Sequence, residues 1–119
     1  MKNIILLIAV LFTGACATTP IPTVKSVAGI YENSVPNVGI WKLLLMKNGE
    51  WEEYKEGSTD KDEGHWKIVD GEIHKKHRDD LIATYRINED GSITHTAFLI
   101  GGKRKETPRD KQPTSIKLN

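Results

Sequence analysis

Turn dipeptides that favour positive backbone φ recur through the middle and the end of this chain of 119 residues. They are Asn48-Gly49, Asp70-Gly71, Asp90-Gly91 and Gly101-Gly102. Asn-Gly and Asp-Gly favour tight hairpin turns because both residues tolerate positive φ, and strand-like runs flank each dipeptide. Apolar residues at the three- and four-residue spacing of a helix are absent between residues 27 and 106. The central part of the chain is therefore predicted to be all-β.

The turns divide this part into a series of antiparallel hairpins. The predicted strands are residues 27–32, 40–47, 50–56, 63–69, 72–76, 81–87 and 92–100, with 103–106 as a further candidate. An up-and-down meander of seven to nine strands has two raw edges, and closure into a barrel removes them. We therefore predict a single antiparallel meander that closes into a small barrel. Its narrow interior is filled by side chains or holds one small ligand.

The hairpin at Asp70-Gly71 predicts a specific strand register. A two-residue loop pairs Ile68 with Ile73 and places Trp66 on the same face as both. The other face then carries the polar side chains His65, Lys67 and His74.

The amino-terminal residues have the pattern of a secretory signal. A short positive head, 1–3, precedes nine apolar residues, 4–12, whereas a helix needs about 20 to cross a bilayer. The small residues Thr13-Gly14-Ala15 follow, and then Cys16, the single Cys, which excludes an internal disulfide. Residues 1–15 are therefore predicted to be a signal peptide.

The segment from Leu11 to Cys16 resembles the lipobox of bacterial lipoproteins, with Thr13 where the family usually has Leu. The resemblance implies cleavage after Ala15 and acylation of Cys16, giving a lipid anchor of two or three chains, which holds far more firmly than one. Ala17, in place of the Asp that retains enteric lipoproteins in the inner membrane, implies an outer-membrane protein facing the periplasm. The alternative is an ordinary secretory signal that leaves a free thiol in an oxidising compartment.

The remaining chain divides into three parts. Residues 16–26 contain two Pro and three Thr and read as an extended, lipidated tether. Residues 27–107 form the barrel domain, and 108–119 are either a tail or a short closing strand. Removal of Lys2 with the signal leaves equal numbers of acidic and basic residues, so no nucleic-acid partner is expected.

Several strand and turn motifs resemble those of one protein family. They are Gly29-x-Tyr31-Glu32, Lys47-Asn48-Gly49, Glu63-Gly64-x-Trp66-Lys67-Ile68 and Asp70-Gly71-Glu72-Ile73. Over residues 27–107 the chain looks like the small bacterial lipocalin-like lipoproteins and is similar to the amino-terminal barrel of copper-resistance-type lipoproteins. The resemblance implies a lipocalin-like barrel. Tyr31 replaces the usual Trp of lipocalins, and the Cys-x-x-Cys of the copper-resistance type is missing, so metal or redox sensing by that route is not implied.

The sequence lacks motifs for catalysis or for a cofactor. It has no Gly-x-Ser-x-Gly elbow, phosphate loop or dinucleotide fingerprint. His65 and His74 share a predicted face, and His77 lies close to two Asp, but zinc sites usually show tighter, repeated spacing. We therefore predict a non-enzymatic protein without a cofactor or a metal site.

Aromatic and imidazole side chains on the predicted strands are the candidates for ligand binding. They are Tyr31, Trp41, Trp66, Tyr85 and His95. The simpler interpretation of the aromatic residues is that they pack in the core. The simpler interpretation of His95 is that it is a hydrogen-bonded core residue. The leading hypothesis is an envelope lipoprotein whose barrel binds a small apolar ligand.

Two other functions stay open. One is a protein-binding module, such as an inhibitor of a cell-wall hydrolase, that uses a strand edge or the basic cluster in 102–111. The other is a hydrolase with His95 or a carboxylate at the base of a cleft.

Overall fold

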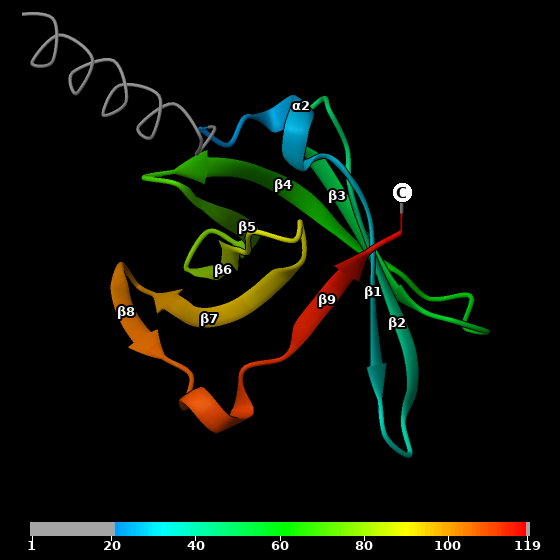
Figure 1. The fold of residues 1–119 in the computed structure, drawn as a ribbon. Coiled ribbons are helices and arrows are strands. Elements are labelled where there is room, and N and C mark those ends of the chain that lie inside the picture. The colour runs from blue at the N-terminus through cyan, green and yellow to red at the C-terminus, as the bar shows by residue number, and fades with distance from the viewer. Residues whose placement is uncertain (1–20, 119) are drawn as a thin grey trace, which may run out of the picture.

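The computed structural model describes residues 21–118, so the predicted signal peptide 1–15 and the predicted lipid site Cys16 lie outside the described residues. Nine strands follow one another along the chain (Figure 1). They are β1 Gly29–Val35, β2 Gly39–Leu45, β3 Glu50–Lys55, β4 Asp62–Val69, β5 Glu72–Arg78, β6 Leu81–Ile87, β7 Ile93–Ile100, β8 Lys103–Glu106 and β9 Thr114–Lys117. A short helix, α2 Val24–Val27, precedes β1, and a 3-10 turn, η1 Arg109–Lys111, lies between β8 and β9.

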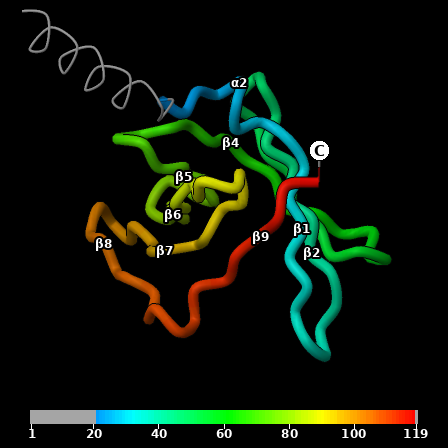
Figure 2. Tube along the Cα trace, in the orientation of Figure 1, coloured from blue at the N-terminus to red at the C-terminus, as the bar shows by residue number. Residues whose placement is uncertain are grey.

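The strands close into an antiparallel barrel, as the sequence predicts. Strands β1 to β7 each pair with the next in the chain, and β9 pairs with both β7 and β1. The trace in Figure 2 shows β9 running between these two strands. This ring has eight strands, and β8 pairs with β7 outside it. Residues 114–117 are therefore a closing strand, which is one of the two alternatives that the sequence left open.

The predicted register at Asp70-Gly71 is confirmed. Ile68 lies opposite Ile73 across β4 and β5, and both turn residues have positive φ, 51° at Asp70 and 81° at Gly71. The hairpin at Asn48-Gly49 differs from the prediction because β2 ends at Leu45, not at residue 47. The Gly49 amide donates to the Met46 carbonyl, so the loop takes four residues, 46–49, in place of two.

The segment before β1 corrects the sequence interpretation. The sequence predicts an extended segment over 16–26 and a first strand from 27, but α2 occupies 24–27 and β1 begins at Gly29. Thr23 and Ser26 form a reciprocal capping box, in which each side chain accepts from the other residue's amide. The Thr and Pro content of this segment suggested a tether and concealed that capping pair.

The core lies inside the barrel and continues under α2. Its largest fully buried apolar side chains include Trp51, Tyr31 and Leu45, and Val27 of α2 packs into the same cluster. The Trp51 indole N–H donates to the Lys76 carbonyl at 3.1 Å, directly beside Gly64. A Cβ at Gly64 would lie 2.5 Å from that carbonyl oxygen and 2.7 Å from Trp51 Nε1, so β4 requires glycine at this point.

The helical elements of the described part are short. Among residues 21–118, none has the length and apolar character needed to span a bilayer.

Candidate functional site

The barrel interior holds a buried lysine. Lys75 on β5 is 1% exposed, and its Nζ lies 2.9 Å from Oε1 of Glu53 on β3. The same Nζ lies 4.5 Å from the ring centroid of Trp51 and 5.5 Å from that of Tyr85, so both rings contribute cation–π attraction. The alternation of β5 places Lys75 on the inner face with Ile73, while Glu72 and His74 face outward.

This cluster keeps its charges at neutral pH. Burial alone would lower the pKa of Lys75, but its ion pair with the Glu53 carboxylate acts in the opposite direction, and the pKa is raised. Burial raises the pKa of Tyr85, so its hydroxyl keeps its proton. The Lys75 ammonium lies beside the Tyr85 ring, and the protonated Tyr85 hydroxyl is a hydrogen-bond donor.

His95 on β7 lies across from Tyr85 on β6, with 5.5 Å between their ring centroids. Its Nε2 is buried, and among the described residues it has no hydrogen-bond partner. Burial and the nearby Lys75 lower the pKa of His95, and a hydrogen bond to the backbone of Ala97 acts in the opposite direction. The imidazole is therefore neutral at pH 7, and in the tautomer that carries its proton on Nδ1 the buried Nε2 is an acceptor.

A cavity of about 100 Å³ borders these groups. Its lining residues come from six strands and the segment before β9: Tyr31, Asn33, Trp41, Leu43, Glu53, Tyr85, His95, Pro113 and Ser115. The structure thus brings together four of the five candidate ligand residues, namely Tyr31, Trp41, Tyr85 and His95. The fifth, Trp66, lies elsewhere in the core and donates its indole N–H to the Met46 carbonyl at 2.9 Å.

A larger cavity of about 630 Å³ lies beside α2 and the turns at 70–71 and 88–91. Its residues are Ile21, Pro22, Ser26, Val27, Tyr31, Gly71, Ile87, Asn88, Glu89, Gly91 and Lys117. Tyr31 lines both cavities, and its hydroxyl donates to the Val27 carbonyl. Burial raises the pKa of Tyr31 to about 12, so this hydroxyl stays protonated.

Sequence reasoning missed Glu53 and Lys75. Both lie in runs of charged residues, 52–56 and 74–78, which resemble a solvated face. The two-residue alternation of strands could have identified both as inward-facing, because Lys75 is two residues from Ile73 and Glu53 is two residues from Trp51. A residue two positions from a core residue in a strand shares its face.

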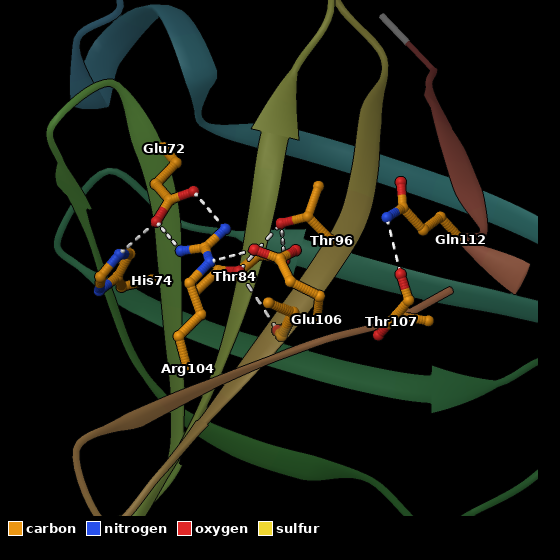
Figure 3. Close-up of polar contacts among 9 residues, drawn as sticks. Glu72, His74, Thr84, Thr96, Arg104, Glu106, Thr107 and Gln112 are labelled. Carbon is orange, nitrogen blue, oxygen red and sulfur yellow. Dashed lines mark hydrogen bonds and ion pairs between the residues drawn. The ribbon is translucent and has the colours of Figure 1, made fainter. Parts of the chain in front are cut away.

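The outer face of the sheet carries a second charged cluster (Figure 3). Arg104 on β8 donates to both carboxylate oxygens of Glu72, at 2.8 and 3.3 Å, and to Glu106 at 2.8 Å. Partial burial would raise the pKa of Glu72, but hydrogen bonds from Arg104 and His74 lower it. Arg104 of the predicted basic cluster is therefore held in ion pairs with its own chain.

The histidines considered for metal binding have different surroundings. His74 hydrogen-bonds Glu72 on the outer face, whereas His77 lies 5.0 Å from the Trp51 ring centroid. Within residues 21–118, no three His, Cys, Asp or Glu side chains are grouped so as to hold a metal ion.

Comparison of the chain with family models, curated proteins and solved structures finds no match. The fold and the two cavities define the chain as a small closed β-barrel with a partly polar interior.

Proposed function

We propose that this chain is a lipid-anchored, non-enzymatic envelope protein whose barrel binds a small apolar ligand in the cavity beside α2. The observation that carries the proposal is the floor of that cavity, where Val27, Tyr31 and Ile87 meet. Its volume of about 630 Å³ falls within the roughly 300–1,000 Å³ of typical small-molecule sites.

The rim of the cavity suits an amphiphile. Polar side chains, Asn88, Glu89 and Lys117, surround the apolar floor, and Lys117 Nζ also donates to the Ser26 carbonyl of α2 at 2.9 Å. An apolar chain on the floor leaves its polar end at this rim. Lys117 also ties α2 to the closing strand, so α2 acts as a fixed wall of the site.

The predicted anchor would place this cavity close to a membrane. Ile21 and Pro22 line it, and Cys16 precedes Ile21 by five positions, a reach of about 17 Å for an extended chain. Acylation of Cys16 would therefore hold the cavity near a supply of apolar ligands. Mass spectrometry of the full chain from bacterial membranes tests this part, and an unmodified Cys16 thiol would overturn it.

A photoactivatable fatty acid tests the ligand. We expect irradiation of the full chain in phospholipid vesicles to crosslink this probe to α2 and to residues around Ile87. Ile87→Glu should abolish the crosslink, because it places a charge on the floor, whereas Ile100→Glu, at a position 48% exposed, should preserve it. Crosslinks that persist in Ile87→Glu would refute the apolar site.

A second candidate function is protein binding through β8. This strand pairs with β7, has no second partner strand in the described part of the chain, and exposes all four of its residues. A free strand edge offers backbone groups to a partner strand. Crosslinked pull-down from envelope extracts should then give one stoichiometric protein that Lys103→Glu/Lys105→Glu no longer captures; recovery without such a partner would exclude this function.

A further inference from the structure

We propose that the smaller cavity binds a neutral vicinal diol, as presented by a small polyol or by the edge of a sugar. This site is separate from the apolar cavity, and either can be correct without the other. Its recognition groups are Glu53, Tyr85 and His95, with Trp41 as an aromatic wall.

The fixed charges around the cavity favour a neutral ligand. Glu53 carries a negative charge, and the Lys75 ammonium 2.9 Å away compensates it. Glu53 lines the cavity and Lys75 balances its charge, so a charged ligand would add a net charge to a poorly solvated cluster, whereas a neutral ligand would not. The neutral His95 ring adds no charge to this balance.

The hydrogen-bonding groups select hydroxyls. Lys75 occupies Oε1 of Glu53, and the other carboxylate oxygen has no hydrogen bond among residues 21–118. Within residues 21–118, His95 Nε2 is a buried ring nitrogen without a hydrogen-bond partner and acts as the second acceptor, and the Tyr85 hydroxyl of the same lining supplies a donor. Two acceptors and one donor match a pair of neighbouring hydroxyls, because each hydroxyl donates once and also accepts.

The size and the walls of the cavity agree with this chemistry. A volume of about 100 Å³ corresponds to about three waters at roughly 30 Å³ each. It therefore admits two or three carbons with their hydroxyls, and the remainder of a sugar would extend outward past Trp41 and Pro113. The half-buried Trp41 ring offers an apolar face to the C–H groups of such a ligand.

NMR titration of the full chain in detergent micelles tests this proposal with three probes of similar size, glycerol, acetate and methylammonium. We expect glycerol alone to give saturating shifts at the Trp41 indole N–H and the His95 ring. The Trp66 indole, which lies outside the cavity, is the internal control and should not respond. Linear shifts with glycerol, or saturation with a charged probe only, would overturn the proposal.

Matched tyrosine variants test the donor. Tyr85→Phe removes the hydroxyl proton from the site, whereas Tyr54→Phe changes the opposite face of β3. Glycerol should bind Tyr85→Phe at least tenfold more weakly and Tyr54→Phe as it binds the natural chain. Equal binding to both variants would contradict the assigned role of Tyr85, and if Tyr85→Phe does not fold, the titration of the natural chain alone decides. Ile87→Glu should bind glycerol normally, which separates this site from the apolar one.

Discussion

Two ion pairs attach β5 to other strands, one on each side of the sheet. Inside the barrel Lys75 contacts Glu53 at 2.9 Å, and outside it Glu72 contacts Arg104 at 2.8 Å. The contact lengths are nearly equal, but the Lys75 side chain is 2% exposed and that of Arg104 is 39% exposed. The surroundings of the two pairs, not their geometry, therefore determine what each contributes.

The inner pair is sensitive to substitution because each charge compensates the other. Removing Glu53 would leave the Lys75 ammonium, which is 2% exposed, in a medium that solvates it poorly, and this costs about 3–5 kcal/mol. The outer pair exchanges solvent contacts for protein contacts and typically contributes about 0–1 kcal/mol. The interior is thus the sensitive side of this molecule.

The largest expected effect is that of Lys75→Ala. We expect a loss of about 2–5 kcal/mol in the free energy of unfolding, because truncation of the buried Lys75 side chain leaves a cavity and the 25% exposed Glu53 loses its partner. Urea unfolding measures it, with Lys76→Ala as the control, since Lys76 is half exposed on the adjacent outward position. Similar losses in both variants would remove the contrast between the two faces. The double change Lys75→Met/Glu53→Leu should regain most of the loss.

Gly64→Ala tests the inner face without changing a charge. The added methyl meets the Lys76 carbonyl oxygen and Trp51 Nε1, so we expect a cost of about 1–3 kcal/mol. Thermal unfolding monitored by tryptophan fluorescence measures this cost, and His65→Ala on the neighbouring exposed position is the control. An unaltered midpoint for Gly64→Ala would mean that the indole is not held against β4.

The pH dependence of stability should also come from the interior. The pKa of His95 is lowered in the folded state, so below its unfolded value of about 6.5 the unfolded chain binds more protons. Stability should therefore fall from pH 7.5 to 5.5, by at most about 1.4 kcal/mol per pH unit for each such group. His95→Asn should reduce this slope, leaving the part due to His77, whose pKa is also lowered by burial and by Lys75. Urea unfolding across this range would contradict the assignment if His65→Asn reduced the slope as much as His95→Asn.

Arg104→Ala should have the smallest effect. The outer cluster is solvated, so we expect a loss of at most about 1 kcal/mol, and less at high salt. Urea unfolding at 0.05 and 1 M NaCl measures it. A loss as large as that of Lys75→Ala would show that the two sides of β5 are equally sensitive.

The fold followed from the sequence because turn chemistry is local. Asp70-Gly71 determined a register, and the alternation around it identified Trp66 and Ile73 as core residues. The closing strand was one of two alternatives, because its pairing with β1 joins residues far apart in the chain and leaves no local signal. α2 was missed because a four-residue helix has no apolar periodicity to detect.

The candidate site was predictable only in part. The aromatic residues that line the smaller cavity stand out in the sequence, whereas its charged pair joins two polar runs through a contact between residues 53 and 75. Period-two reasoning from Trp51 and Ile73 identifies these inward positions. The cavity volumes depend on how strands that are distant in the chain pack together. A single sequence does not specify this packing.

The seam closed by β9 has a consequence for synthesis. A ribosome releases β1 early and β9 last of the strands, so the barrel cannot be completed until residue 117 has emerged. Until then, β1 and β7 lack the strand that joins them, and such open edges recruit strands from neighbouring chains. A nascent chain stalled before residue 114 would therefore need shielding by a chaperone, although nearly all of its core residues had already been made.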